Sequence, residues 1–122
     1  MSDPAVAHIP LVMTGGAVRA HKEYSMLMNQ SDIAATLFAQ MGIGTDGFIL
    51  SRNVLSPGYK NMRQMALHSF KGGSNLFLGD TVLRVECADV SITSYNNDAP
   101  TDEQKHFLKA ILQYIYQKTG EL

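Results

Sequence analysis

The sequence contains few residues that would define a chemical site by themselves. It has a single cysteine, Cys87, which rules out an internal disulfide bond and a zinc site built from several cysteines. We expect Cys87 to pack as a small apolar side chain. Neither the HxxxH nor the CxxC spacing of metal sites occurs, and the P-loop and GxSxG patterns are also missing. The residues alone therefore provide no complete catalytic constellation.

The sequence also lacks an excess of charge of one sign and any long apolar run. Ten Lys and Arg residues stand against eleven Asp and Glu residues, so there is no basic field of the kind that nucleic-acid binding requires, and we expect no nucleic-acid partner. No apolar run approaches the roughly 20 residues that cross a bilayer. The N-terminus has neither the basic region nor the apolar core of a signal peptide, so we expect a soluble chain without a targeting signal.

The first part of the chain predicts one buried strand. Residues His8 to Met13 form a nearly continuous apolar run, with Pro10 near its start and Gly15 and Gly16 after its end. A second stretch, Tyr24 to Met28, either forms a short strand or lines the core. The polar stretch between the two is expected to be exposed.

A helix is predicted from Ser31 to Gly42. Ser31 is a good N-cap, Asp32 places negative charge at the positive end of the helix dipole, and Gly42 ends the helix. An apolar face is predicted from the spacing of Ile33, Leu37 and Met41. The glycine-rich stretch from Gly42 to Gly58 has no sustained period and is predicted to be a loop that buries Phe48, Ile49, Val54 and Leu55 locally.

The second half of the chain predicts an antiparallel meander followed by a helix. Four short strands are expected near 65–69, 75–78, 81–86 and 90–93, with turns at Gly72-Gly73 and Gly79-Asp80. Thr101 and Gln104 form a capping box at the start of a helix that runs to about Lys118 and stops at Gly120. Its apolar face should lie on the meander and comprises Phe107, Leu108, Ile111, Leu112 and Ile115.

The histidines and hydroxyl residues are the chemical candidates that remain. His21 lies in a charged run, His68 on the strand face opposite Met65 and Leu67, and His106 in the first turns of the last helix, so all three are expected at the surface. None of three hydroxyl residues is expected to be a nucleophile, because each has a simpler role. Ser31 is a helix cap, Thr14 ends a strand and Thr36 lies inside a helix.

Four segments in order resemble the closing third of a sulfatase-type domain of the alkaline phosphatase superfamily, in its lipoteichoic-acid-synthase-like or phosphoglycerol transferase branch. They are HIPLVMTGGAV, NQSDIAATLFAQMGI, SRNVLSP and HFLKAILQYIYQ. The family's helix often reads Asp-x-x-Pro-Thr-Leu-Leu. Asp32, Thr36 and Leu37 match that pattern, whereas Ala35 replaces the proline and Phe38 the last leucine.

The resemblance implies an α/β fold in which residues 1–122 are one partial domain. Residues 1–58 would supply a strand, a helix and a loop of the main α/β/α sheet, and residues 59–122 the meander with its C-terminal helix. Family members hydrolyse sulfate or phosphate esters or transfer phosphoglycerol groups, with a threonine or formylglycine nucleophile and divalent Mn, Zn, Ca or Mg. Their nucleophile and most metal ligands precede this stretch, so no catalytic or metal-ligating residue is assigned here.

His8 and Arg52 are the substrate-binding candidates that the resemblance implies. The alternative for His8 is a structural side chain held by a backbone partner at the mouth of its strand. For Arg52 we favour a structural role, in which its five donors hold the loop against the core. The parent protein would be a bacterial enzyme that is membrane-anchored or periplasmic, and this chain's partner would be the upstream catalytic part of the same polypeptide.

Two functions from different classes follow. The first is the C-terminal segment of a metal-dependent sulfatase or phosphoglycerol-transferase-like enzyme, inactive alone. The second is a stand-alone, non-catalytic module that dimerises or binds a partner. In either case, an uncovered strand at Ile9 to Met13 would favour a homo-oligomer of the isolated chain.

Overall fold

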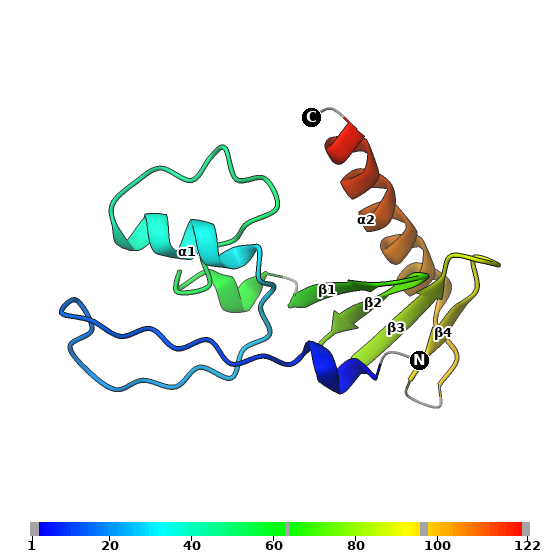
Figure 1. Ribbon diagram of the computed structural model, residues 1–122, viewed down its shortest axis with the longest axis horizontal. Helices are drawn as coiled ribbons and strands as arrows, with labels where there is room; N and C mark the ends of the chain where they lie inside the picture. Colours follow the sequence, from blue (N-terminus) through cyan, green and yellow to red (C-terminus); the bar gives the residue numbers. More distant parts are fainter. Residues whose placement is uncertain (1–2, 63, 96–97, 121–122) are drawn as a thin grey trace. The chain divides into compact units, whose positions relative to one another are not determined.

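The computed structural model describes residues 3–62, 64–95 and 98–120 (Figure 1). The chain divides between Ala66 and Leu67 into two compact units. We call them the N-terminal unit and the C-terminal unit and describe each by itself. The boundary predicted from the sequence lies between Gly58 and Tyr59.

The N-terminal unit begins with a short 3-10 helix, η1 (Pro4–Ala7), whose first turn is capped by Asp3. The predicted strand from His8 to Met13 is wrong. All residues from 8 to 31 are described, and none belongs to a helix or strand. Val12 is 77% exposed, and Ile9 is exposed as well. An apolar run becomes a buried strand only beside partner strands, and the described part of the chain pairs none with this one.

The stretch from Tyr24 to Met28 also forms no strand, and its last residues line the interior of this unit instead. Met26, Leu27 and Met28 are half-buried. The backbone carbonyl of Leu27 accepts a hydrogen bond from the Tyr59 hydroxyl at 2.5 Å. The second of the two alternatives for this stretch is therefore the one observed.

Helix α1 (Asp32–Gln40) begins and ends where the sequence predicts, and Gly42 follows it with a φ of +72°. The predicted apolar face is not the face that the unit covers most completely. Leu37 and Met41 are exposed, whereas Asp32, Ala35 and Thr36 are buried. The spacing of Ile33, Leu37 and Met41 shows only that these side chains share a face, and hydrogen bonds described below turn the opposite face inward.

The loop after α1 is confirmed, and a short 3-10 helix, η2 (Tyr59–Asn61), follows it. In the loop, the predicted burial is correct for Val54 and Leu55 but not for Phe48 and Ile49. Val54 is buried and Leu55 half-buried, but Phe48 and Ile49 are exposed. The Phe48 ring lies 5.2 Å from that of Phe38 on α1, a contact at the surface of the unit.

The predicted meander is present, and apart from its first two residues, Met65 and Ala66, it belongs to the C-terminal unit. Strands β1 (Met65–Phe70), β2 (Gly73–Leu78), β3 (Thr81–Glu86) and β4 (Ile92–Ser94) lie in the order β1-β2-β3-β4. β3 is antiparallel to both β2 and β4, with Leu76 opposite Leu83 and Val85 opposite Ile92. Tight turns join the first three strands, and Gly72 and Gly79 have the positive φ that such turns require.

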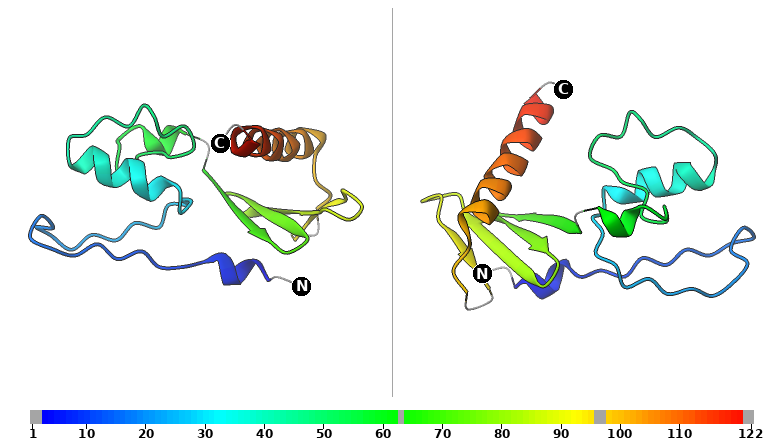
Figure 2. Two further views of the ribbon diagram at one scale, coloured as in Figure 1. Left: turned by 45° about the horizontal axis from the view of Figure 1, so that its top comes forward. Right: turned by 180° about the vertical axis from the view of Figure 1, so that it is seen from behind.

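Helix α2 (Asp102–Gly120) lies across one face of this sheet, as the left view of Figure 2 shows. Its capping box is confirmed: the Thr101 N–H donates to Gln104 Oε1 at 3.0 Å, and the Gln104 N–H donates to Thr101 Oγ1 at 3.2 Å. Leu108 is fully buried with Leu76, Leu83 and Val85. Packed against this cluster are Leu67, Leu78, Ile92, Phe107, Ile111 and Leu112. The predicted helix face is therefore the one that packs.

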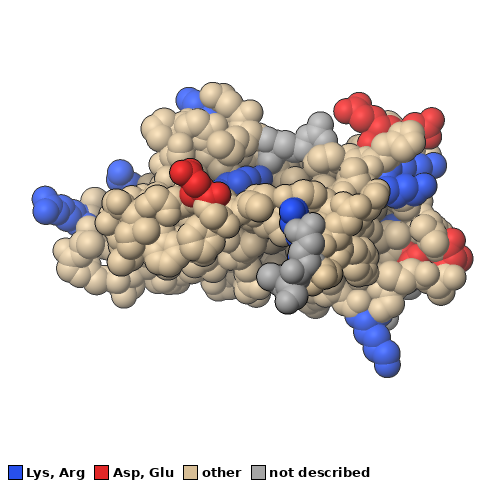
Figure 3. Space-filling view, turned by 90° about the horizontal axis from the view of Figure 1, so that it is seen from above, with Lys and Arg blue, Asp and Glu red and all other residues tan. Residues whose placement is uncertain are grey.

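The surface carries no large field of one charge on the face shown in Figure 3, where acidic and basic side chains are scattered among uncharged ones. No described helix combines the length and the apolar character needed to cross a membrane.

Cys87 is exposed, contrary to our expectation of a packed side chain. It directly follows β3 in the turn toward β4, where the chain has left the sheet that would cover it.

Candidate functional site

A buried ion pair joins the start of α1 to the loop that follows it. The Asp32 side chain is 1% exposed, and Arg52 Nη2 donates to Asp32 Oδ2 at 2.8 Å. Asp32 Oδ1 accepts from Arg52 Nε at 3.1 Å and from the Arg52 backbone N–H at 2.9 Å. The Asn29 backbone N–H donates to Asp32 Oδ2 at 2.8 Å. Both carboxylate oxygens therefore accept two hydrogen bonds each, as a buried carboxylate requires.

The same loop also supplies hydrogen-bond partners for the first turns of α1. Ser51 Oγ accepts from the Ala35 backbone N–H at 2.9 Å. Thr36 Oγ1 donates to the Asp32 carbonyl at 2.7 Å and accepts from the Val54 N–H at 3.1 Å. Ser31, the predicted cap, makes no side-chain hydrogen bond to the helix and instead accepts from Asn29 Nδ2. The helix is thus held by residues that lie 16 to 20 positions away in the sequence.

Arg52 is held on several sides. Its Nη2 also donates to the Met65 carbonyl at 2.9 Å, and its guanidinium lies 5.2 Å from the centre of the Tyr59 ring. Burial by itself lowers the pKa of Arg52, but the hydrogen bond and the charge of Asp32 outweigh it, so the pKa is raised and the guanidinium stays charged. Burial raises the pKa of Tyr59, which stays a neutral hydrogen-bond donor. These contacts fit the loop-holding role that we favour for Arg52.

This cluster, which we call the Asp32–Arg52 staple, is built to hold structure. The lone pairs of the Asp32 carboxylate are occupied by protein donors, and its charge is neutralised at hydrogen-bond distance. A group that abstracts a proton or binds a substrate cation needs an accessible oxygen. The staple therefore stabilises α1 and its loop and offers no acid–base function in this form.

The four histidines lie on separate segments, two in each unit. His8 is exposed after η1, and His21 is exposed with Nε2 3.2 Å from Glu23 Oε1. His106 is exposed on α2, as predicted. His68 lies on the predicted face of β1, but it is half-buried rather than exposed, with its ring 6.4 Å from that of Phe70. Arg52, the other substrate-binding candidate, is held by the contacts described above.

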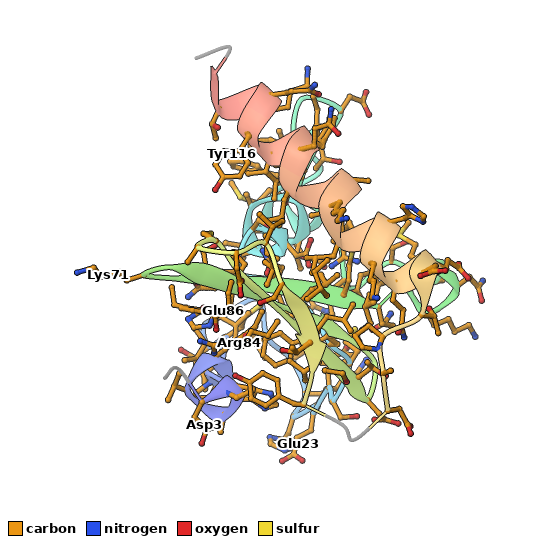
Figure 4. The ribbon with its side chains drawn as sticks, turned by 90° about the vertical axis from the view of Figure 1, so that its right-hand side faces the viewer. Asp3, Glu23, Lys71, Arg84, Glu86 and Tyr116 are labelled. Carbon is orange, nitrogen blue, oxygen red and sulfur yellow. The ribbon has the colours of Figure 1, made fainter. Side chains whose placement is uncertain are left out.

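A second polar cluster lies on the face of the sheet that points away from α2. Arg84 Nε forms an ion pair with Glu86, and Arg84 Nη1 donates to the Tyr95 hydroxyl at 2.8 Å. The guanidinium stacks 4.3 Å from the centre of the Phe70 ring. The hydrogen bond to Glu86 raises the pKa of Arg84. Figure 4 shows Arg84 and Glu86 side by side on this face.

Within residues 3–62, 64–95 and 98–120, no group of three or more His, Cys, Asp or Glu side chains could hold a metal ion. The described side chains therefore do not fit a divalent metal of the kind that the resemblance implies. We derive no chemical step through such an ion. Comparison of the chain with family models, with curated proteins and with solved structures found no match.

Sequence reasoning missed the Asp32–Arg52 staple as a unit. It assigned Asp32 to the helix dipole and Arg52 to the loop, each correctly placed, but it did not join them. The available signal was that an acid and a base occur as the lone charged residues of two segments, NQSDIAATLFAQMGI and SRNVLSP. Opposite charges in apolar surroundings are costly to bury unless they pair.

Proposed function

We propose that this chain is the C-terminal part of a metal-dependent sulfatase or phosphoglycerol-transferase-like enzyme of the alkaline phosphatase superfamily. The order of its four segments, from HIPLVMTGGAV to HFLKAILQYIYQ, supports this assignment. The substrate would be a sulfate or phosphate ester. The segment is expected to be inactive alone, because the nucleophile and the metal ligands of such an enzyme belong to the preceding part of the polypeptide.

The observation that carries this proposal is the outward-facing apolar surface of the N-terminal unit. Leu37 on α1 and Met41 at its C-terminal cap are 43% and 67% exposed, and the run from Ile9 to Met13 is exposed as well. Exposed apolar area of this extent marks a surface that packs against further polypeptide. In the proposed enzyme, that polypeptide is the upstream catalytic part, which would cover the exposed apolar residues of this unit.

The Asp32–Arg52 staple supports the proposal in a second way. Its two charged residues come from the second and third of the four segments, and the staple makes these segments one structural unit. A helix that turns a polar, stapled face toward its own loop presents its apolar face to another partner. This arrangement suits a helix that covers a larger sheet.

The gene provides the most direct test. We expect an open reading frame that continues upstream of Met1 and encodes an Asp-His-Gly segment before SDPAVAHIP. A promoter and a ribosome-binding site directly before Met1 would contradict the proposal.

A biochemical test uses the 122-residue chain with nitrophenyl sulfate and nitrophenyl phosphate and added manganese, zinc or calcium. We expect no nitrophenol release, and metal-dependent turnover that is lost in His8→Ala would overturn this expectation.

One observation favours the alternative of a stand-alone, non-catalytic module. The C-terminal unit has a hydrophobic core of its own, in which Leu76, Leu83 and Leu108 are each fully buried. In this alternative the C-terminal unit would fold without upstream sequence, and the exposed apolar residues of the N-terminal unit would bind a partner or a second copy. Sedimentation velocity over a concentration series tests self-association. A monomer at high micromolar concentration would contradict pairing through the exposed Ile9 to Met13 segment.

A further inference from the structure

A pocket of about 410 Å³ opens on the N-terminal unit beside η2. Its lining includes Val54 and Tyr59, which are both buried, and the apolar side chains of Met26, Leu55 and Pro57. Pockets that hold small molecules have volumes of about 300 to 1,000 Å³ and are lined mainly by apolar groups with a few polar ones. The pocket thus has the size and the lining of a small-molecule site.

The segments that line the pocket are tied to each other and to α1. The Tyr59 hydroxyl donates to the Leu27 carbonyl, so the stretch that carries Met26 is held against η2. The backbone N–H of Val54 donates to Thr36 Oγ1 at 3.1 Å, which holds the loop side of the pocket against the helix. A pocket held in this way is formed before a ligand binds, and this lowers the ordering cost of binding.

Three polar side chains, Ser56, Lys60 and Gln64, complete the lining, and each has a donor to spare. Ser56 Oγ accepts from the Gly58 N–H at 3.3 Å, which leaves its own hydrogen to donate. Gln64 Nε2 donates to the Tyr59 carbonyl at 3.2 Å and carries a second hydrogen. Lys60 is exposed and forms no ion pair with any residue in the described ranges of the chain. The pocket therefore offers donors and one positive charge that no described side chain neutralises.

These features specify the shape and the charge of the ligand. The aliphatic lining favours an alkyl chain, and the donors with their one cation favour an anionic acceptor at its end. A single ammonium balances one negative charge, which matches a carboxylate better than a phosphate monoester with a charge of about −1.5 to −2. Arg52 does not add a second cation, because its guanidinium is paired with Asp32.

We propose that this pocket binds a small aliphatic carboxylate. Its alkyl chain lies against Val54 and Tyr59, and its carboxylate accepts from the three polar side chains and lies beside the Lys60 ammonium. The proposal goes beyond the enzyme assignment above and does not rest on it, because its test measures binding by this chain and requires no catalytic activity.

The test titrates octanoate into the full 122-residue chain with ¹³C-labelled methionine methyl groups. Met26 reports on the pocket, and Met41, which is 67% exposed, reports on non-specific binding to apolar surface. Met26→Leu identifies the Met26 signal. We expect a saturable shift of that signal and little change at Met41. Butanoate, which is four methylenes shorter, should bind more than about a hundredfold more weakly.

Variants test the role of the charge. Lys60→Met removes the ammonium and keeps an unbranched apolar side chain, so octanoate should bind about fivefold more weakly, whereas the binding of uncharged 1-octanol should not change. Lys109→Met, on the exposed side of α2, is the matched control and should bind octanoate normally.

Several outcomes would overturn the proposal. Equal shifts of Met26 and Met41, or no saturable shift at millimolar octanoate, would remove the pocket as a binding site. Octanol that binds the parent chain as tightly as octanoate, or equal weakening by Lys60→Met and Lys109→Met, would remove the role of Lys60. Tighter binding of octyl phosphate than of octanoate would rule out a carboxylate as the preferred head group.

Discussion

The two units of this protein are stabilised by different means. In the C-terminal unit, leucine and valine side chains from β2, β3 and α2 form a fully buried apolar cluster. In the N-terminal unit, the fully buried side chains include Asp32 and Thr36, and most of the large apolar residues that remain exposed in the chain lie here. The C-terminal core is thus mainly apolar, whereas the N-terminal unit buries an ion-paired carboxylate and a hydroxyl as well as Ala35, Val54 and Tyr59.

This difference predicts how the stability of each unit should respond to single substitutions. Apolar burial is distributed over many contacts and tolerates the partial loss of one of them. A buried ion pair concentrates its contribution in two side chains, and removing one of them leaves an uncompensated charge. The N-terminal unit should therefore depend on single residues more sharply than the C-terminal unit does.

The largest effect is expected from Asp32→Ala. This change leaves the buried part of Arg52 without its counter-ion and should destabilise the N-terminal unit by about 3 to 5 kcal/mol. Amide hydrogen exchange should show lost protection at Ala35 and Val54, while the amides of Leu76 and Leu83 keep theirs. Glu23→Ala removes an exposed pair and is the control. Equal loss of protection in both units would show that the units do not differ in this way.

Leu108→Ala should destabilise the C-terminal unit by about 2 to 5 kcal/mol through lost burial and a residual cavity. Ile111→Ala, at a half-buried position, should cost less. Lys109→Ala, on the exposed side of α2, should stay within about 0.5 kcal/mol. Urea unfolding followed by circular dichroism measures all three, and equal midpoints for Leu108→Ala and Lys109→Ala would contradict the packing of α2.

Thr101→Ala should destabilise α2 by about 1 kcal/mol, because it removes the side-chain acceptor of the Gln104 N–H. Thr119→Ala is a matched control at the other end of the helix, where the hydroxyl bonds the Ile115 carbonyl. Thermal unfolding compares the two variants. A larger loss for Thr119→Ala would mean that the capping box contributes little.

The smallest effect concerns Asp89 in the turn between β3 and β4. Hydrogen bonds from the side chain and the backbone of Ser91 lower the pKa of Asp89 below its ordinary value of 3.8. The associated stability is present above the pKa of the unfolded chain and is lost as the pH falls through the folded-state pKa. An NMR titration should find the lowered pKa, and Ser91→Ala should move it back toward 3.8. An unchanged pKa in Ser91→Ala would assign the shift to the backbone alone.

The elements that short-range patterns specify were predictable. The alternation in β1, the boundaries of β3, and the capping box of α2 all follow from residues that lie within a few positions of one another. The apolar stripe of α2 is broad enough to define its buried face without further information. In the C-terminal unit, sequence and structure agree because the apolar face of each strand and of α2 packs into the same core.

The N-terminal unit was harder to predict because its patterns allow more than one partner. The run from Ile9 to Met13 suits a buried strand, but a strand forms only where another strand offers its backbone groups. α1 has an apolar face and a polar face, and periodicity alone could not say which one the chain would cover. Leu37 and Met41 are exposed because the chain covers the polar face of α1.

The sequence by itself determined the meander, the two helices, both ends of α1 and the start of α2, since these depend on periodicity, caps and turn glycines that are local in the chain. Only the tertiary structure decided that Asp32 pairs with Arg52, that Ser51 rather than Ser31 bonds the first turns of α1, and that the Asn75 side chain is buried with no hydrogen-bond partner among the described residues. The physical reason is the same in each case. Hydrogen bonds and ion pairs form between atoms that are close in space, and a separation of 20 residues along the chain does not specify which atoms will meet.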